Sequence, residues 1–275
     1  MAIYLVATPI GNLEDITLRA LRVLKEVRLI AAEDTRTTRK LLNHYGIKTP
    51  LTAFYEHSGL ARLEQVLRSA SEGDVAVVSE AGMPGLSDPG YELVSAAIER
   101  GIDIIPVPGA TAPVASLVVS GLSTEKFLYL GFLPRRNTER RRLLDSVALE
   151  PYTLVAFEAP HRLLASLQSL WEVLGDRRIA VARELTKLHE EIYRGTISDS
   201  IRHFNQPRGE FTLVIEGYHD TPDTKDESEV RKALHRAMAS GLSHRDASTR
   251  VAKEVGWSKK EVYRLAAQEN KPPFI

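Results

Sequence analysis

Three turns rich in glycine and proline have the composition of ligand-binding loops. Because glycine has no Cβ, such turns let a small ligand approach the backbone closely. The longest, Ser79–Gly90, follows the β-branched run Val75–Val78, and we expect its Asp88 to cap the next helix, with Pro89 at the first helical position. An elaborate strand-to-helix loop is the alternative interpretation. The other two turns are Ala7–Leu13 and Pro106–Pro113.

Lys187 is the best candidate for an acceptor site, meaning a place where a hydroxyl or a phosphate of a substrate binds. It lies in a dense polar run, Arg183–Glu191, directly after an apolar strand-like segment. The flanking carboxylates are expected to keep its ammonium charged, which suits binding of a hydroxyl or a phosphate better than abstraction of a proton. A solvated charged loop is the alternative.

A second polar cluster, containing Glu33, Asp34 and Arg36, follows the apolar run Leu29–Ala32. The two carboxylates are candidates for capping the next helix, which would be a structural role. Their place at a strand end keeps a role at the acceptor site open, with Asp34 and Arg36 supporting Lys187. His57 is a candidate base because imidazole titrates near neutral pH, although a lone loop histidine is more often exposed surface.

Two groups of cations suggest contact with nucleic acid. Five arginines fall within eight residues after the turn Gly131–Pro134, with only Glu139 to offset them. Such a local patch on a chain of zero net charge indicates phosphate binding, whereas a solvated helix face is the alternative. The two groups are Arg135, Arg136, Arg140, Arg141 and Arg142, and, near the C-terminus, Lys259, Lys260 and Arg264.

The elements that position these residues begin with an α/β domain, expected over residues 1–118. Short apolar strands alternate with helices there, which predicts a mostly parallel sheet covered on both faces. Ligands of such sheets bind beyond the carboxyl ends of the strands, and all three turns follow strands. The expected strands are Ile3–Ala7, Leu29–Ala32, Leu51–Ala53, Val75–Ser79 and Asp103–Val107, and the expected helices are Thr17–Val27, Thr37–His44, Leu60–Ser71 and Tyr91–Arg100.

A second domain of the α+β type is expected over residues 119–220, and a linker with three helices over residues 221–275. The helices Glu229–Ala239, His244–Val255 and Ser258–Gln268 form a helix-turn-helix-like module, which is typical of nucleic-acid binding or of dimerisation. The second domain is predicted to contain strands Phe127–Phe132, Thr153–Phe157, Ile179–Arg183, Glu191–Arg194 and Phe211–Glu216 and a helix His161–Leu174.

Composition limits the classes of function. The 275 residues include no cysteine, which excludes disulfides, thiolate nucleophiles and cysteine-ligated zinc, and we predict no metal site. No signal-like or membrane-spanning run is present in the sequence, so we expect a cytoplasmic protein that does not contact membranes. The fingerprints G-x-G-x-x-G and G-x-x-x-x-G-K-[ST] are absent.

Several motifs together resemble one family, the bacterial 16S ribosomal RNA cytidine 2′-O-methyltransferases (the RsmI family). These motifs are Ala7–Asp15, Ala32–Arg36, Ser79–Gly90, Phe157–Arg162, Arg183–Lys187, Glu190–Glu191 and Arg194–Thr196, and the resemblance covers essentially the whole chain. Met83 and Glu80 depart from the family pattern, but neither change removes a glycine.

The resemblance implies two α/β domains of the tetrapyrrole methylase type, with a cofactor cleft between them, plus the C-terminal helical module. It implies S-adenosylmethionine as cofactor, 16S rRNA of the small ribosomal subunit as substrate, and a homodimer. A tetrapyrrole methyltransferase of the same fold and a non-enzymatic nucleic-acid-binding regulator are the alternatives. Together with the three turns, the resemblance places the cofactor against Pro9, Ile10, Gly11, Ala81, Gly82, Met83, Pro84, Gly85, Thr111, Ala112, Phe132, Leu133, Phe157 and Glu158.

Overall fold

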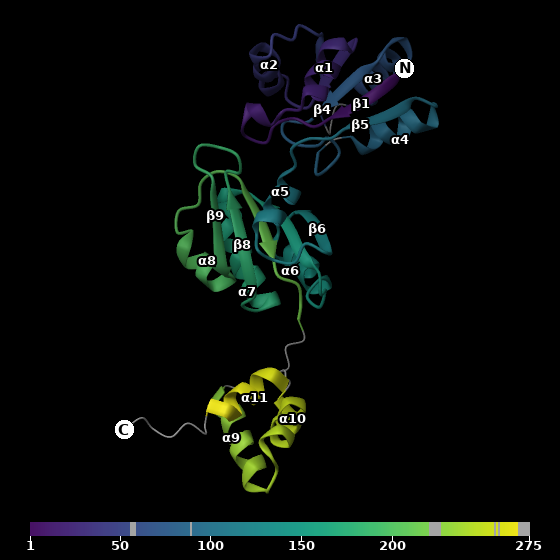
Figure 1. The fold of residues 1–275 in the computed structure, drawn as a ribbon. Coiled ribbons are helices and arrows are strands. Elements are labelled where there is room, and N and C mark those ends of the chain that lie inside the picture. Colours follow the sequence, from purple (N-terminus) through teal and green to yellow (C-terminus); the bar gives the residue numbers. More distant parts are fainter. Residues whose placement is uncertain (56–58, 89, 220–226, 256, 258, 269–275) are drawn as a thin grey trace. The chain divides into compact units, whose positions relative to one another are not determined.

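The computed structural model describes residues 1–55, 59–88, 90–219, 227–255, 257 and 259–268. It divides into two compact units, Met1–Tyr218 and His219–Ile275. His57 and Pro89 lie outside the described residues, so the predicted roles of these two residues stay predictions. Figure 1 labels the elements.

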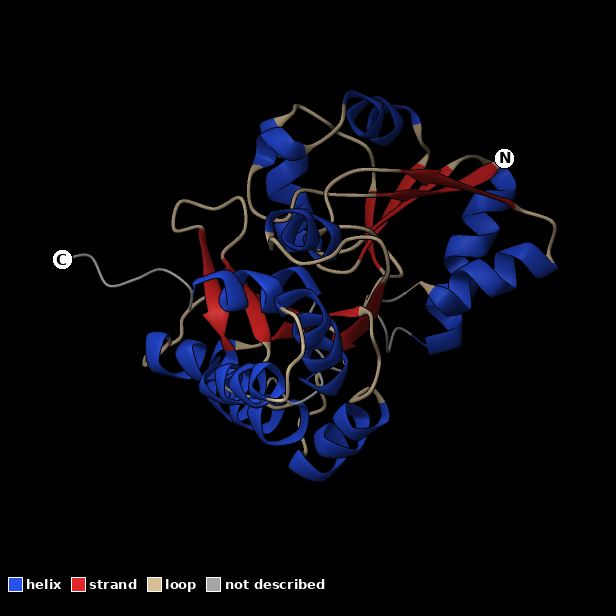
Figure 2. Ribbon diagram, turned by 60° about the horizontal axis from the view of Figure 1, so that its bottom comes forward, coloured by secondary structure: helices blue, strands red, loops and turns tan. Residues whose placement is uncertain are grey.

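The first five strands form one parallel sheet in the order β3-β2-β4-β1-β5. The alternation of short apolar strands and helices in the sequence predicted this arrangement, and Figure 2 shows helices beside the strands. Strand β4 is buried throughout, because a sheet covered on both faces has no solvent side. The strands are β1 (Ala2–Val6), β2 (Leu29–Ala32), β3 (Leu51–Ala53), β4 (Val75–Val78) and β5 (Asp103–Val107), and the helices are α1 (Leu18–Glu26), α2 (Thr35–His44), α3 (Gly59–Glu72) and α4 (Tyr91–Glu99), with a 3₁₀ turn η1 (Leu13–Asp15).

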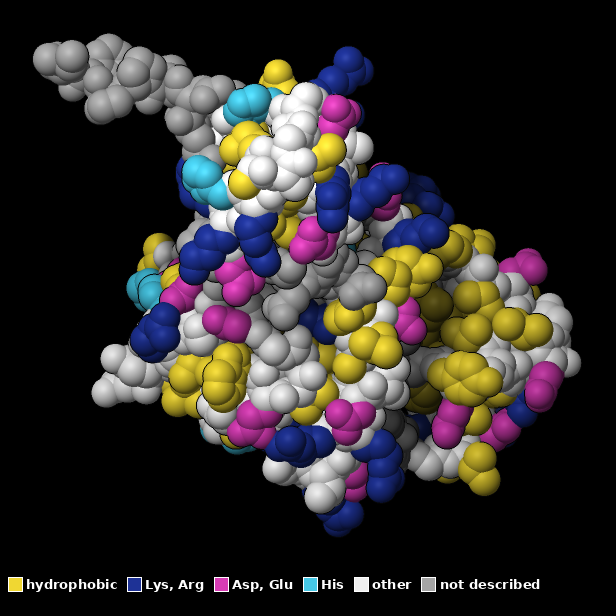
Figure 3. Space-filling model, turned by 90° about the horizontal axis from the view of Figure 1, so that it is seen from below, with side chains coloured by type: hydrophobic (Ala, Val, Ile, Leu, Met, Phe, Trp, Pro, Cys, Tyr) yellow, Lys and Arg dark blue, Asp and Glu magenta, His cyan; other side chains and the backbone are white. Residues whose placement is uncertain are grey.

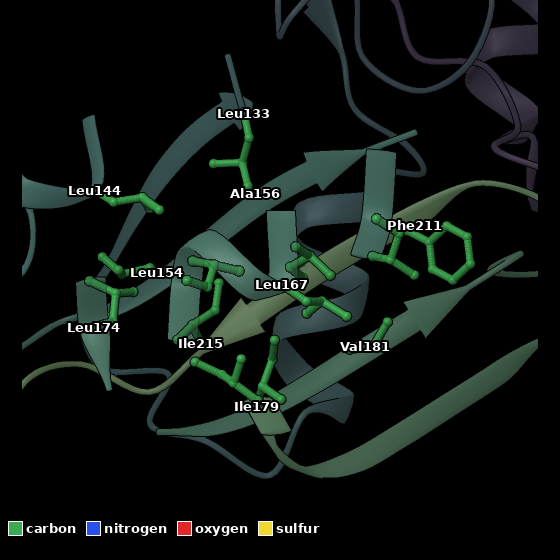
Figure 4. Packing of buried hydrophobic residues seen from close by; sticks show 14 of the residues in the cluster. Leu133, Leu144, Leu154, Ala156, Leu167, Leu174, Ile179, Val181, Phe211 and Ile215 are labelled. Atoms are coloured by element: carbon green, nitrogen blue, oxygen red, sulfur yellow. The ribbon is translucent and has the colours of Figure 1, made fainter. Parts of the chain in front are cut away.

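The second sheet is mixed, in the order β6-β7-β10-β8-β9, with only the β6–β7 pair parallel. Helix α7 packs a row of leucines on one face of this sheet and forms the largest apolar core (Figure 4). The strands are β6 (Phe127–Phe132), β7 (Thr153–Glu158), β8 (Arg178–Arg183), β9 (Glu191–Thr196) and β10 (Phe211–Ile215), and the helices are α6 (Asn137–Ser146), α7 (Leu163–Leu174) and α8 (Ile197–His203), with η2 (Pro160–Arg162) before α7.

One helix, α5 (Ala112–Val119), corrects the predicted domain boundary at residue 118. Its Leu117 packs with Val155, Ala180 and Val214 of the second sheet, so the chain leaves the first domain before this helix. The sequence did not predict α5, because its residues are nearly all apolar or small and carry no helical period of polar residues. Helix α8 was also missed, since its seven residues lie in a region read only as strands.

The C-terminal unit consists of three helices, α9 (Glu227–Ala239), α10 (His244–Val255) and α11 (Lys259–Gln268), as the sequence predicted. They enclose a small core of their own that includes Leu234, Val251 and Leu265. Positive and negative side chains are interspersed on the face that Figure 3 shows. Among the described residues, no helix combines the length and the apolar character needed to cross a bilayer.

Candidate active site

The three predicted turns meet at the carboxyl ends of three neighbouring strands. Because β4, β1 and β5 are adjacent, the turn after each strand emerges at the same edge of the sheet. In chain order, the first turn follows β1, the second follows β4 and the third follows β5. An isolated antiparallel bridge joins the first turn to the second: Thr8 N donates to Gly82 O at 2.9 Å, and Gly82 N donates to Thr8 O at 3.1 Å. Ala7 N donates to Val107 O at 3.1 Å, which ties the first turn to the third. The predicted convergence of the turns is therefore confirmed.

Gly82 lies where all three turns come together. A Cβ at this position would stand 3.5 Å from Ile10 Cγ2 and 3.8 Å from Ala110 O, atoms of the other two turns. Its φ of +80° and the +83° of Gly85 are left-handed conformations that residues with a Cβ rarely adopt. A valine at either position would therefore strain the backbone, and at position 82 its side chain would also meet the other two turns.

The first and second turns each touch the second sheet or its loops. A Cβ on Gly11 would lie 2.5 Å from Lys187 Cγ and 2.8 Å from Leu185 O, so only glycine allows this approach. In the second turn, Ser87 Oγ and the Tyr129 hydroxyl of β6 are hydrogen-bonded at 2.7 Å. The turns of the first sheet thus meet second-sheet residues at two separate points.

Two buried hydroxyls near these contacts have no hydrogen-bond partner among the described residues, Thr8 Oγ1 and Thr186 Oγ1. A Cβ on Gly11 would lie 2.8 Å from Thr186 Oγ1, so this hydroxyl faces the first turn. An unpaired buried hydroxyl costs free energy, so each of these two groups calls for a partner such as a water or a ligand. Both threonines belong to motifs that are visible in the sequence, but nothing in the sequence alone indicates a role for either of them.

The loop after β8 is conformationally strained. Glu184 and Thr186 have φ of 51° and 65°, which is unusual for residues other than glycine and more so for a β-branched one. The hydrogen bond from Thr186 N to Glu190 Oε2 at 2.6 Å helps to hold this conformation. Strain of this kind persists where the surroundings impose it, often at functional sites.

Lys187 is charged, as its flanking carboxylates predicted. Its Nζ lies 2.9 Å from Glu184 Oε1 and 3.0 Å from Glu210 Oε2. Burial alone would lower the pKa of Lys187, but the hydrogen bonds to the two carboxylates outweigh burial and raise it. A protonated ammonium donates hydrogen bonds and cannot take up a proton, so Lys187 is suited to binding rather than to base catalysis.

Asp34 caps helix α2, which was the structural alternative. Its Oδ1 accepts from Arg36 N at 2.7 Å and from Thr37 N at 3.4 Å. The backbone hydrogen bond from Arg36 is the main cause that holds the pKa of Asp34 below its usual value. The Arg36 side chain is 90% exposed and pairs with Asp34 at 3.5 Å. A supporting role for this pair at the acceptor site stays a prediction.

Asp88 does not cap α4, which corrects the prediction. The N-cap is Gly90, and no side chain bonds to the helix N-terminus. Burial, followed by the negative charge of Glu33, raises the pKa of Asp88 to about 6; a hydrogen bond from Ser79 opposes the rise and the charge of Glu80 adds to it. The carboxyl therefore lies beside other acidic groups at the ends of β2 and β4 instead of at a helix terminus.

Two of the residues predicted to close the cofactor site are parts of the protein interior. The Leu133 side chain points into the large apolar core beside Leu144 and Ala156 (Figure 4). Glu158 is 2% exposed and pairs with Arg162 at 2.6 Å, and it also accepts a hydrogen bond from the Ser166 hydroxyl. Neither side chain is available to a ligand.

The remaining predicted cofactor residues differ in accessibility. Phe132 is 55% exposed and its ring packs against the half-buried Phe157 at a centroid distance of 5.3 Å, so both rings reach the surface. Gly11, Ala81 and Gly85 are exposed, Pro9, Ile10, Met83, Thr111 and Ala112 are half-buried, and Gly82 and Pro84 are buried.

The arginine cluster contains one buried member. Arg140 is 5% exposed and donates to Ser169 Oγ at 3.1 Å and to Pro134 O at 3.3 Å, so it fixes the start of α6 instead of facing a phosphate. Arg136 pairs with Glu139, and Arg141 pairs with Glu172. The exposed Arg135 and Arg142 have no ion-pair partner within the part of the chain that the structure describes.

The predicted cations of the C-terminal unit lie on α11. Lys259 and Arg264 are exposed, and the exposed ring of Tyr263 lies beside Arg264 in the chain. The side chain of Lys260 lies outside the described residues.

Comparison with known proteins agrees with this fold. The profile of the tetrapyrrole (corrin/porphyrin) methylases matches residues 2–200. A Synechocystis protein named ribosomal RNA small subunit methyltransferase I is 47% identical over 272 residues, which cover 97% of both chains. A Thermotoga maritima protein of the same name is 50% identical over 216 residues, which cover 78% of this chain and 97% of that protein. The crystal structure of a diphthine synthase superposes with a TM-score of 0.63 at 12% identity, covering 79% of this chain and 90% of that one.

Proposed function

Because this chain belongs to the tetrapyrrole (corrin/porphyrin) methylase family, and within it to the ribosomal RNA small subunit methyltransferase I proteins, we propose that it methylates the 2′-oxygen of a cytidine ribose in 16S rRNA with S-adenosylmethionine as methyl donor. The observation that carries the proposal is 47% identity to a protein of that name over 97% of both chains. The exposed arginines beside α6 support an RNA substrate over a small tetrapyrrole, which would not need a phosphate-binding patch.

The residues at the meeting point of the turns fit S-adenosylmethionine. The unpartnered hydroxyls of Thr8 and Thr186 offer hydrogen bonds to its polar groups, and the glycines at 82 and 85 leave the backbone open. No phosphate-binding fingerprint is needed, since this ligand carries no phosphate. When bound, S-adenosylmethionine supplies an electrophilic methyl group on a sulfonium.

The main role of the protein in the reaction is to align the two reactants. Displacement at a methyl carbon requires the acceptor oxygen, the methyl and the sulfur to lie in line, so most of the barrier can be lowered by positioning. Lys187 donates hydrogen bonds to the acceptor ribose or its phosphate, with Asp34 and Arg36 in support. The Gly11 backbone packs on Lys187, which couples the acceptor side to the first turn.

The surface cations extend this proposal to docking of the substrate. Arg135, Arg136, Arg141 and Arg142, together with Lys259, Lys260 and Arg264 of the C-terminal unit, hold the RNA backbone by charge. In a homodimer, each set would occur twice. Methylation of rRNA takes place where ribosomal subunits are assembled, so we place the protein in the cytoplasm.

The test is a methylation assay on ribosomal RNA. Small subunits from a strain that lacks this enzyme are incubated with the purified protein and labelled S-adenosylmethionine, and the digested 16S rRNA is examined by mass spectrometry. The proposal expects one new 2′-O-methylcytidine. Methylation of a tetrapyrrole substrate in a parallel assay, with none of the rRNA, would establish the alternative function.

A further inference from the structure

One ammonium group near the proposed acceptor site is shared by two carboxylates that differ in their surroundings. Lys187 Nζ lies 2.9 Å from Glu184 Oε1 and 3.0 Å from Glu210 Oε2. The side chain of Glu184 is 20% exposed, whereas that of Glu210 is 78% exposed. The two distances are almost equal, so the difference between the partners lies in what else holds each carboxylate.

Glu184 is held from several sides. Its Oε1 also accepts from Glu210 N at 2.9 Å, and its own N donates to Glu210 O at 3.0 Å. The neighbouring Gly209 has no Cβ, and one placed there would lie 2.5 Å from Glu184 Cδ. Burial would raise the pKa of Glu184, but the hydrogen bonds from the Glu210 backbone and the Lys187 ammonium lower it, so the carboxylate stays charged.

Glu210 is held by its carboxylate at one point. Within the described residues, the ion pair with Lys187 is the only one its side chain makes. An ion pair of an exposed carboxylate is weak, so an incoming anion can replace it. A phosphate offers the same kind of acceptor oxygens to an ammonium as a carboxylate does. Exchange of one anion for the other leaves the local charge nearly unchanged.

We propose that Glu184 is the positioning residue of Lys187, and that Glu210 occupies the place on the same ammonium that a phosphate of the acceptor RNA takes on binding. This inference rests on the proposed function, because it assumes that Lys187 faces the acceptor. Glu184 acts through Lys187 and does not touch the substrate. Glu210 is a displaceable counterion that competes with RNA.

The two roles predict different kinetic effects of the same substitution, glutamate to glutamine, at the two positions. Glu184→Gln lowers kcat about a hundredfold, because a small misplacement of an aligning group is enough for such a loss. Gly209→Ala displaces the same carboxylate without removing a charge and also lowers kcat; its φ of +87° adds a loss of folding stability, which thermal unfolding measures separately. Glu210→Gln keeps kcat within twofold and lowers KM for RNA about two- to fivefold, as expected from loss of a weak competing ion pair.

A matched control lies at the other end of strand β10. Glu216 pairs with Arg178 at 3.6 Å and follows the strand that Glu210 precedes, so Glu216→Gln removes a half-buried carboxylate far along the same strand. It leaves kcat and KM unchanged. Thermal unfolding establishes whether each variant is folded. If Glu184→Gln is unfolded, Gly209→Ala tests the positioning role of Glu184 in its place.

The outcomes separate this inference from the function on which it rests. Equal losses of kcat in Glu184→Gln and Glu210→Gln, or a raised KM in Glu210→Gln, would overturn the inference while Lys187→Ala remained inactive. A Lys187→Ala variant that methylates rRNA normally would overturn the acceptor role of Lys187 and, with it, this inference. Absence of rRNA methylation by the unaltered protein would instead refute the proposed function.

Discussion

The two sheets contribute to the candidate site in different ways. The parallel first sheet supplies backbone through the turns at the ends of β1, β4 and β5, and Gly82 and Gly85 in the turn after β4 adopt left-handed conformations. The mixed second sheet supplies charged side chains from the loop between β8 and β9, where Lys187 is held by two carboxylates. Parallel strands bring successive turns to one edge, whereas an antiparallel pair presents a single connecting loop.

This difference indicates a division of labour. Backbone turns that exclude side chains suit a ligand recognised by shape, and a charged loop suits an acceptor recognised by its phosphates and hydroxyls. The two regions touch at Gly11 and Lys187, so they are coupled although each has its own chemistry. Variants that alter one region and spare the other test the division.

The largest effect is expected from Gly11→Ala, which acts on the contact between the regions. The added Cβ would lie 2.5 Å from Lys187 Cγ and 2.8 Å from two oxygen atoms, so the loop of the second sheet must move away. We expect methylation to fall at least a hundredfold, because positioning is lost. A methylation assay at saturating cofactor measures this.

Gly101→Ala is the control for the alanine substitution itself. Gly101 has a φ of +68° and no heavy atom would meet its Cβ within 4 Å, so the variant loses about 1–2 kcal/mol of folding stability through backbone strain alone. Activity should remain. Wild-type turnover in Gly11→Ala would show that the two regions are not coupled through this contact.

Removal of the C-terminal unit should have the next largest effect. A protein ending at Tyr218 retains both sheets and all three turns, so we expect S-adenosylmethionine to bind with nearly unchanged affinity. The truncated protein lacks the exposed cations Lys259 and Arg264 of α11, so methylation of small subunits should decrease about tenfold. Undiminished methylation would make the three helices a packing or stability element.

The exposed arginines beside α6 should give a moderate effect. Arg135→Glu with Arg142→Glu should weaken RNA binding about tenfold and flatten its dependence on salt, because phosphate contacts release counterions. Arg140 is left intact, since its burial means that reversing its charge would disrupt the packing of α6. Binding measured between low and moderate salt gives the slope, and an unchanged slope would remove this patch from the RNA site.

The smallest effect concerns stability and pH. The pKa of Asp88 is raised to about 6 in the folded chain, so the folded state holds a proton that the unfolded state has lost, and stability decreases as pH rises from about 4 to about 6. Asp88→Asn removes this penalty and should be more stable than the parent by about 1–2 kcal/mol at pH 7.5, with little difference at pH 4. Denaturant unfolding at both pH values measures this, and equal differences at both would contradict the shift.

Much of the fold could be predicted because most helices and strands are marked by local, regular patterns of apolar residues and glycines. The strand Leu29–Ala32 and the helix His244–Val255 were predicted to the residue, since apolar runs and glycine stops mark their ends. Helix α5 was not predicted, because its apolar residues pack against a sheet whose strands come later in the chain. It belongs to the second domain because of this packing. Nonlocal packing of this kind leaves no periodic signal.

The site was predictable where the residue type itself imposes the geometry. The glycines predicted the turns, and the flanking carboxylates predicted the charged state of Lys187. Burial was not predictable, and this is why Arg140 was assigned to a phosphate-binding surface that its side chain does not reach. The unpaired hydroxyls of Thr8 and Thr186 depend on contacts between distant segments, which composition does not reveal.

The most direct test of the division between the sheets is to measure cofactor binding and methyl transfer in Lys187→Ala. Calorimetry with S-adenosylmethionine and single-turnover methylation of small subunits are carried out on the same preparation. We expect cofactor affinity within about twofold of the parent and methyl transfer reduced at least a hundredfold. Methyl transfer at the parental rate, or loss of cofactor affinity equal to the loss of rate, would contradict it.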